Sequence, residues 1–326
     1  MLTIAVIGCG QLGSRHLQAL THLSVPAQIY AVDPDRKSIE IAQMRVKEIV
    51  DARPEVKFAF YAEMSSIPPT IDIAIVATSS HIRAKVIEDL LSRTTVRYLI
   101  LEKVLFQTVE EYAQVGALLK EKKIKAWVNC PRRMFPGYQW LLNELNGSIP
   151  WEIHVQGSTW GLASSCIHMI DAFSYLTGSE DCRIDAVDLA SGLLPSKRDG
   201  FYEFDGRVQG FFDRGARFSI SSFPSGSVPL SVQVTANSAM ALVLEGESKA
   251  YLAREGEGWM WKEYSFHTLK QSEMTHLFVQ DLVEYGTCRL PSYYTSAKLH
   301  LPMIQAFIQT LRMTTDNPTL ERCLIT

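Results

Sequence analysis

The stretch Thr3-Ile4-Ala5-Val6-Ile7-Gly8-Cys9-Gly10-Gln11-Leu12-Gly13 decides the fold of this chain. An apolar run leads directly into glycines spaced as Gly-x-Gly-x-x-Gly, and a helix-like segment follows. A second apolar run, residues 29–32, ends on Asp33. The order strand, glycine turn, helix, strand and acid is typical of a domain that binds a dinucleotide.

Each glycine of this turn has its own expected role. Gly8 allows the tight turn after the strand, and Gly10 lets the backbone approach a pyrophosphate. Gly13 allows the helix to pack closely on the sheet. The helix begins near Gln11 and Leu12, where unpaired N–H groups and the positive end of the helix dipole would face the phosphates. The alternative is a glycine turn that binds nothing.

Asp33 predicts which dinucleotide binds. Its carboxylate would accept hydrogen bonds from the adenosine ribose hydroxyls and repel a 2′-phosphate, which favours NAD over NADP. Arg36 and Lys37 keep NADP open because they could hold a 2′-phosphate, although such residues also form solvated faces. Asp33 could instead cap a helix that starts at Pro34, and the two roles can coexist.

Composition limits the class of protein. The chain has 326 residues, 47% of them hydrophobic and 21% charged, which suits a globular protein of two domains. Its net charge of −3 provides no broad attraction to nucleic acid or membranes. We expect no membrane span and no secretory signal. The six cysteines are scattered without a C-x-x-C pair, so we expect a cytoplasmic protein without a metal site.

The order of elements predicts two domains. Residues 1–129 alternate strands and helices, which predicts an α/β Rossmann domain with a doubly wound parallel sheet. Residues 130–326 predict an α+β domain on a large, mostly antiparallel open sheet, with one face free to pack on a partner. Further strands are expected at 56–60, 71–77, 98–101, 125–128, 151–156, 184–189, 208–213, 216–222, 230–235 and 241–245. Helices are expected at 36–50, 82–91, 109–122, 137–145, 165–176, 273–285 and 294–312.

Five further motifs follow one another at characteristic places. They are Arg15-His16 after the glycine turn, Ala77-Thr78-Ser79 after the fourth strand, Glu102-Lys103 at the end of a buried strand, Asn129–Arg133 at the domain junction, and Cys166–Asp171 at the start of a helix. Together with the glycine turn they resemble the motifs of the Gfo/Idh/MocA oxidoreductases, which include glucose-fructose oxidoreductase and inositol dehydrogenase. The resemblance covers essentially the whole chain. It implies an NAD(P)-dependent oxidoreductase with a Rossmann domain followed by an open-sheet domain.

The resemblance also implies roles for two residues. Lys103 matches the lysine of the family's Glu-Lys-Pro motif, which lies beside the nicotinamide and contacts the reacting sugar hydroxyl. An ammonium there stabilises developing negative charge. His168 matches the catalytic histidine, whose pKa near neutrality suits a general base. The alternatives are a surface lysine and a histidine packed on the apolar side of its helix. Glu102 is expected near the cofactor, or it only anchors its loop.

Other positions match the family less closely. Ser164 stands where the motif usually carries an aspartate; it can hydrogen-bond a sugar but cannot act as a carboxylate partner. Asp171, one turn after His168, could orient the imidazole, bind a substrate hydroxyl, or be an ordinary helix carboxylate.

Val104 replaces the proline of Glu-Lys-Pro. Thr78, Ser79 and His81 are expected near the cofactor, and Arg83 stands where a histidine is frequent. These departures suggest a specialised branch or one that has lost redox activity.

The expected substrate is a sugar or nucleotide-sugar, because Arg132 and Arg133 at the domain junction could grip a carboxylate or phosphate. The alternative is an exposed pair of charges. Trp160 could stack on a sugar ring, although aromatic residues more often fill a core. Family members that modify sugars for surface polysaccharides provide one parallel.

We expect a homodimer or homotetramer through the second sheet. The rival hypotheses are a non-catalytic NAD-binding sensor or scaffold, and an NAD enzyme that uses transient oxidation for elimination or hydrolysis.

Overall fold

The computed structural model describes residues 1–145, 147–190, 192–315 and 317–326. These residues form two compact units. Unit 1 contains residues 1–106, 110–129 and 269–293, and unit 2 contains residues 107–109, 130–268 and 294–326. Residues 269–293 fall within the second predicted domain by sequence, yet they belong to unit 1.

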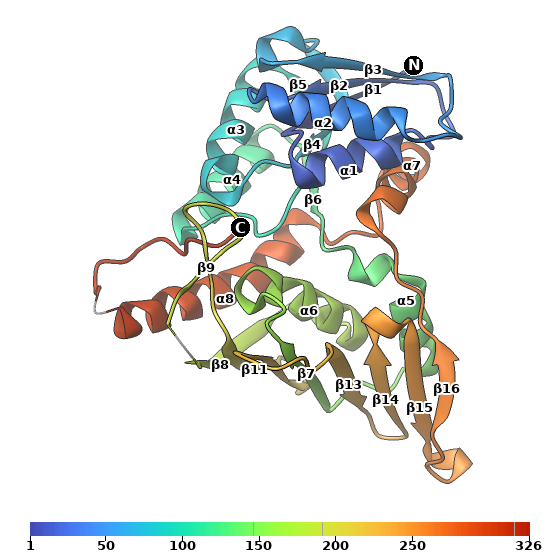
Figure 1. The fold of residues 1–326 in the computed structure, drawn as a ribbon, viewed down its shortest axis with the longest axis vertical. Coiled ribbons are helices and arrows are strands. Elements are labelled where there is room, and N and C mark those ends of the chain that lie inside the picture. The colour runs from blue at the N-terminus through green and yellow to red at the C-terminus, as the bar shows by residue number, and fades with distance from the viewer. Residues whose placement is uncertain (146, 191, 316) are drawn as a thin grey trace. The chain divides into compact units, whose positions relative to one another are not determined.

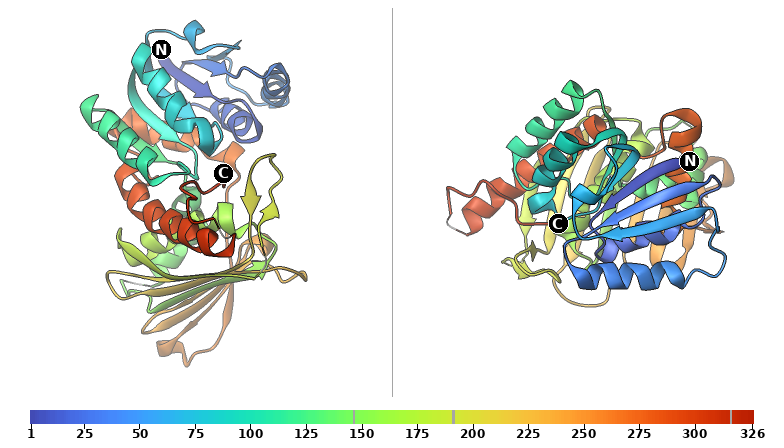
Figure 2. Two further views of the ribbon diagram at one scale, coloured as in Figure 1. Left: turned by 90° about the vertical axis from the view of Figure 1, so that its left-hand side faces the viewer. Right: turned by 90° about the horizontal axis from the view of Figure 1, so that it is seen from above.

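Unit 1 is a doubly wound α/β fold, as predicted (Figure 1). Its six strands are parallel and follow the order β3-β2-β1-β4-β5-β6. Helices α1 and α2 cover one face of the sheet, and α3 and α4 cover the other (Figures 1 and 2). The elements are β1 (Leu2–Ile7), α1 (Gln11–Leu20), β2 (Ala27–Val32), α2 (Arg36–Lys47), β3 (Val56–Tyr61), β4 (Thr70–Val76), α3 (Ser80–Arg93), β5 (Thr95–Leu101), α4 (Val109–Glu121) and β6 (Lys125–Val128).

The centre of this sheet explains its apolar sequence. Residues Ile4 to Val6 of β1 and Ile73 to Val76 of β4 are fully buried, since helices cover both faces. The strand order changes direction between β1 and β4, and ligands of open α/β sheets bind beyond the carboxyl ends of strands at such a switch point. The glycine turn follows β1 at this position.

A segment from late in the chain completes unit 1. The short helix η5 (Gln271–Glu273) and helix α7 (Thr275–Tyr285) pack against α1. Beyond α7, the backbone N–H of Val128 in β6 donates to the carbonyl of Pro291 at 3.0 Å. The Rossmann sheet is therefore supported at two places by residues distant in sequence.

Unit 2 contains an eight-stranded mixed sheet in the order β16-β15-β14-β13-β7-β12-β11-β8. Only β7 and β12 pair in parallel; every other neighbouring pair is antiparallel, so the prediction of a mostly antiparallel sheet is confirmed. The strands are β7 (Glu152–Ser158), β8 (Cys182–Leu189), β11 (Gly206–Phe212), β12 (Arg217–Phe223), β13 (Ser231–Thr235), β14 (Ala239–Leu244), β15 (Lys249–Arg254) and β16 (Lys262–Ser265). Strands β15 and β16 were not expected from the sequence.

Helices α6 (Leu162–Thr177) and α8 (Tyr293–Thr314) lie over one face of this sheet (Figure 2). In β7, Ile153 and Val155 are buried, whereas the alternate residues Glu152 and Gln156 are exposed on the opposite face. Unit 2 also holds α5 (Pro136–Glu144) and a small hairpin of β9 (Leu194–Pro195) and β10 (Tyr202–Glu203). The short helices η2 (Pro131–Met134), η3 (Glu245–Glu247) and η4 (Glu255–Glu257) also lie in unit 2, whereas η1 (Met64–Ser66) belongs to unit 1.

The described helices include none with both the length and the apolar character needed to cross a membrane.

Candidate functional site

The glycine turn after β1 is too crowded for side chains at two of its glycines. A Cβ atom on Gly13 would lie 1.7 Å from the carbonyl oxygen of Gly8. Gly8 has φ +94°, and a Cβ there would lie 2.9 Å from the carbonyl carbon of Ala77. The close approach of α1 to the end of β1 therefore requires both glycines.

Gly10 differs from its neighbours because a Cβ there would meet no protein atom within 4 Å. Packing within the protein therefore does not require glycine at this position. Gly10 is also the N-cap of α1, and among the described residues no side-chain hydrogen bond caps the backbone N–H groups of the first turn. Open space beside an uncapped helix N-terminus fits a pyrophosphate group of a dinucleotide.

Asp33 connects this turn to the end of β2. Its Oδ2 accepts a hydrogen bond from the backbone N–H of Cys9 at 2.7 Å, and its Oδ1 accepts one from Asp35 at 2.8 Å. The prediction that Asp33 could cap the next helix is wrong, because Asp35 is the cap and accepts from the backbone N–H groups of Lys37 and Ser38. The Asp33 carboxylate is turned toward the glycine turn, which leaves the capping position to Asp35.

Arg36 lies on the surface with 91% of its side chain exposed, and its Nε is 3.0 Å from Oε1 of Glu40. Lys37 is exposed as well. Arg36 and Lys37 are thus exposed to solvent, which corresponds to the alternative of a solvated face. At the end of β4, Thr78 and Ser79 are half-buried and His81 is exposed.

Arg83 joins the ends of two central strands from inside the protein. It is 1% exposed. Its guanidinium donates to the carbonyls of Thr78, after β4, and of Val104 and Leu105, after β5, the last at 2.8 Å. The sequence showed Arg83 only as a replacement for histidine. In the structure, Arg83 holds the loop that contains Lys103 through these hydrogen bonds.

Five buried or half-buried polar side chains, Glu102 among them, form a closed ring of hydrogen bonds. His16 Nε2 lies 2.9 Å from Glu102 Oε1, and Asn129 Nδ2 donates to the same oxygen at 2.5 Å. Asn129 also donates to Gln271 at 2.7 Å, and Gln271 donates to Thr275 Oγ1 at 3.0 Å. Thr275 Oγ1 lies 2.8 Å from His16 Nδ1, which closes the ring.

This ring holds Glu102 in position and favours its ionised form. Burial raises the pKa of its carboxyl group, but the contacts with His16 and Asn129 and the charge of Lys103 lower it by more, so the pKa is below its usual value. Lys103 follows directly and is half-buried. The observed partners of Glu102 correspond to the anchoring alternative, and Lys103 therefore extends from an immobilised residue.

Helix α6 of unit 2 carries the remaining predicted residues. It begins after Gly161, three residues earlier than expected, and the Glu203 carboxylate accepts hydrogen bonds from the backbone N–H groups of Ala163 at 3.0 Å and Ser164 at 3.4 Å. An acid at a helix N-terminus satisfies unpaired donors and complements the dipole. Ser164 and His168 are half-buried on this helix.

Asp171 and Arg133 form a buried ion pair. Asp171 is fully buried, and Arg133 binds it in bidentate fashion, with Nε to Oδ2 at 3.0 Å and Nη2 to Oδ1 at 2.6 Å. Burial raises the pKa of Asp171, and the charge of Arg133 opposes this rise. Both oxygens of Asp171 bind Arg133, which is the role the described contacts support; a role in orienting His168 or binding a substrate hydroxyl stays a prediction.

Arg132 forms a second pair of the same kind. Its Nε and Nη2 lie 2.9 and 3.1 Å from the two carboxylate oxygens of Glu245, and the Tyr138 hydroxyl donates to Glu245 at 2.7 Å. The Arg132 and Arg133 side chains are only 15% and 14% exposed. The two arginines are therefore not an exposed pair of charges. Their guanidinium groups are also not open to an anionic substrate, because each already binds a carboxylate from a distant part of the chain.

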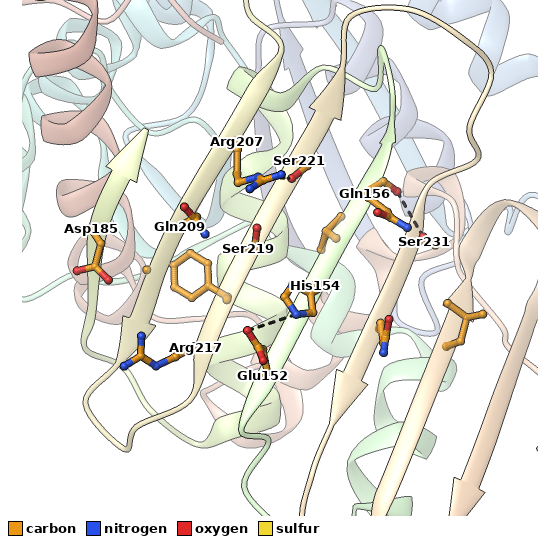
Figure 3. A pocket seen from close by; sticks show the side chains of 15 residues that line it. Glu152, His154, Gln156, Asp185, Arg207, Gln209, Arg217, Ser219, Ser221 and Ser231 are labelled. Carbon is orange, nitrogen blue, oxygen red and sulfur yellow. Dashed lines mark hydrogen bonds and ion pairs between the residues drawn. The ribbon is translucent and has the colours of Figure 1, made fainter. Parts of the chain in front are cut away.

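The described residues of unit 2 line at least two pockets. One, of about 420 Å³, contains the predicted residues Trp160 and Ser164. The other, of about 530 Å³, lies on the outer face of the large sheet, where Arg207, Arg217 and Asp185 project with Glu152 and His154 (Figure 3). Glu152 Oε1 lies 3.3 Å from His154 Nε2. This face is polar, so its composition differs from that of an apolar docking surface.

Residues 2–130 match the model of the Gfo/Idh/MocA oxidoreductases, described as an oxidoreductase family with an NAD-binding Rossmann fold. The match covers the Rossmann part of unit 1, so this part of the chain is similar to the NAD-binding domain of that family. The description of this family model as NAD-binding agrees with the prediction of NAD from Asp33. A comparison with curated proteins finds no match.

Solved structures of similar fold cover nearly the whole chain. UDP-N-acetylglucosamine 3-dehydrogenase of Acidithiobacillus ferrooxidans is 13% identical, with 94% of this chain and 96% of that chain covered and a TM-score of 0.66. An oxidoreductase of Agrobacterium radiobacter in complex with NAD+, L-tartaric acid and magnesium is 14% identical, with 95% and 96% covered and a TM-score of 0.71. The transcriptional regulator Gal80p of Kluyveromyces lactis is 17% identical, with 96% and 93% covered and a TM-score of 0.70. These likenesses show that the fold extends through unit 2.

The Gfo/Idh/MocA motifs in the sequence predict some residues of the candidate site but not their contacts with distant segments. His16 stood beside the glycine turn without a role, and nothing in the sequence linked it to Gln271 and Thr275. Glu203 was missed because a lone glutamate at the end of a short strand carries no signal. The described residues contain no group of three or more His, Cys, Asp or Glu side chains arranged to hold a metal ion.

Proposed function

We propose that this protein is a cytoplasmic NAD-dependent oxidoreductase that transfers a hydride between the nicotinamide and a secondary alcohol or ketone of a sugar or nucleotide-sugar. The observation that carries the proposal is in unit 1. An uncapped helix N-terminus with open space at Gly10 follows β1, and the half-buried Lys103 follows β5 in the same parallel sheet. Both lie beyond the carboxyl ends of strands, where such sheets bind ligands.

The bound cofactor supplies hydride transfer, and the protein supplies position and charge. Residues Gly8 to Gly13 would hold the pyrophosphate, and Asp33 the adenosine ribose. Lys103 polarises the reacting oxygen, because an ammonium stabilises negative charge that develops there and lowers the pKa of an alcohol. Arg83 and the ring around Glu102 position Lys103 by fixing the backbone on both sides of it.

His168 moves the proton of the reacting hydroxyl in this proposal. Imidazole titrates near neutrality and can accept a proton as the carbonyl forms and return it in the reverse direction. Ser164 precedes it by one helical turn and offers a hydroxyl to the sugar instead of a carboxylate. Asp171 supports the helix through its ion pair with Arg133 and has no part in the proton transfer.

A second function is a non-catalytic NAD-binding sensor or scaffold. Two observations favour keeping it: Ser164 replaces the usual aspartate of the family motif, and a transcriptional regulator, Gal80p, shares the fold. An NAD enzyme that uses transient oxidation for elimination or hydrolysis also needs Lys103 and His168, and it differs by producing no net reduced cofactor.

Incubation with NAD and a panel of sugars and nucleotide-sugars tests the proposal. We expect at least one compound to cause a steady rise in the absorbance of reduced nicotinamide. The panel includes UDP-N-acetylglucosamine, because a protein of the same fold is a dehydrogenase of that compound. Tight NAD binding without turnover of any compound contradicts the oxidoreductase proposal and favours the sensor. Product formation without net reduced nicotinamide favours transient oxidation.

We further propose that two or four copies associate through the outer face of the large sheet. The centre of this face carries both charge signs, with Arg207 and Arg217 near Glu152 and Asp185 (Figure 3), and Leu242 lies beside them. A face of this kind can meet a copy of itself through complementary charges. Sedimentation should give a dimer or tetramer, and Arg217→Glu should increase the monomer fraction. A monomer at all concentrations contradicts the assembly.

A further inference from the structure

The pocket beside the start of α6 is built entirely within unit 2. Three parts of the chain line it: the segment from Thr159 to Ser164, the β9–β10 hairpin, and Thr326. The hairpin is held against the end of the chain, because the Tyr202 backbone N–H donates to the Leu324 carbonyl at 2.8 Å. The pocket therefore has walls that are fixed by backbone hydrogen bonds.

The acidic residues of this pocket have structural partners. Glu203 accepts from the backbone at the start of α6, as described above. Asp205 is 3% exposed and accepts a hydrogen bond from the Ser222 hydroxyl. These contacts hold the carboxylates at the wall of the pocket and satisfy part of their hydrogen-bonding capacity.

The cations of the pocket are in a different situation. Lys197 and Arg198 are exposed in the turn between β9 and β10. Within the described ranges, neither forms an ion pair with a carboxylate, and the Arg198 guanidinium reaches only the Thr326 hydroxyl, at 3.3 Å. Arg132 and Arg133, by contrast, each bind a carboxylate in bidentate fashion. Unit 2 thus has two adjacent positive charges at this pocket, and neither forms an ion pair with a carboxylate of the described residues.

Trp160 supplies a rigid aromatic surface beside these cations. Its Nε1 donates to the Ser221 carbonyl at 2.9 Å, and its side chain remains half-buried at the pocket. A ring held by its N–H group can present its face to a sugar ring without further loss of side-chain freedom.

We propose that this pocket binds the anionic part of a sugar substrate, with Lys197 and Arg198 on its phosphate or carboxylate oxygens and Trp160 against the sugar ring. Charge-assisted hydrogen bonds from two cations suit an oxyanion, whereas a neutral sugar would leave both unused. The proposal rests on the proposed function, whose substrate it narrows to anionic sugars. It also assigns to Lys197 and Arg198 the anion-binding role that was predicted for Arg132 and Arg133.

The test is calorimetric titration of the NAD-loaded protein with glucose 1-phosphate, UDP-glucose, glucuronate and glucose. We expect at least one anionic probe to bind more tightly than glucose. The double variant Lys197→Glu/Arg198→Glu should weaken its binding by at least about tenfold, the effect of two lost charge-assisted contacts. The relative affinities of the phosphate and carboxylate probes then distinguish the two kinds of oxyanion.

The matched control is Lys120→Glu/Lys122→Glu, which makes the same change in net charge on exposed lysines of unit 1. It should leave anion binding within about twofold, since long-range charge effects are screened by salt. Equal binding of the anionic probe by both double variants, glucose binding as tight as the anions, or no binding of any probe would overturn the proposal. Anion binding that depends on Lys197 and Arg198 without nicotinamide reduction would support this site and contradict the proposed reaction.

Discussion

The variant Arg133→Met is expected to lower the free energy of unfolding by about 3–5 kcal/mol, because it leaves a buried carboxylate without its counter-ion. Asp171 is fully buried and binds Arg133 through both oxygens. Urea unfolding followed by circular dichroism measures the change. A loss this large would show that Arg133 is part of the framework of unit 2 and is not available to bind substrate.

The control for this prediction removes both charges. The double variant Arg133→Met/Asp171→Leu should recover most of the lost stability, because a buried ion pair can often be replaced by apolar residues at little cost. The single variant Arg198→Met, at an exposed arginine, should change stability by less than about 0.5 kcal/mol. If Arg133→Met is no more costly than Arg198→Met, the ion pair has no structural role.

The variant Gly10→Ala is expected to weaken NAD binding by at least about tenfold while leaving the thermal midpoint of unfolding nearly unchanged. The added methyl group meets no protein atom within 4 Å, so it enters only the space through which a pyrophosphate would approach. Calorimetric titration with NAD and a melting curve measure the two effects separately.

Gly13→Ala is the matched variant in the same turn. Its methyl group would lie 1.7 Å from the Gly8 carbonyl oxygen, so the helix must move and stability should fall by about 1–3 kcal/mol. Gly10→Ala that binds NAD as tightly as the wild-type protein would contradict the placement of the pyrophosphate.

The fold of unit 1 could be predicted because its information is local. Strands buried on both faces, such as β1 and β4, appear as continuous apolar runs, and the glycine turn marks where the first of them ends. The contribution of residues 269–293 to this unit could not be predicted. These residues accept a hydrogen bond from Val128 and contact α1, and no pattern in the sequence indicates that segments so far apart in the chain meet.

Unit 2 shows the same division between local and distant information. Turns such as Arg214-Gly215 predict antiparallel neighbours, but the parallel pairing of β7 with β12 joins strands that are far apart in the chain. Strand β15 was missed because the alternation of Ala250 and Leu252 with Lys249 and Tyr251 is short and follows a glycine-containing turn.

The candidate site was predictable to the extent that its residues belong to motifs. The glycine turn, Asp33, Lys103 and His168 could all be named from sequence. Arg132 and Arg133 could also be named as cations, yet the carboxylates that bind them belong to Glu245 and Asp171, in other elements. Whether a charge is open to a ligand depends on such partners, and only the folded chain shows them.

Turnover by Lys103→Ala, His168→Ala and the double variant, measured as reduction of NAD with the best compound of the panel, tests the central claim most directly. Loss of a positioned acid–base group typically costs about 10²–10⁴ in rate. We expect each single variant to lose most of its activity with NAD affinity unchanged. The double variant should lose far less than the product of the two, because groups that act in one step are not additive. Activity that survives both substitutions would contradict the account.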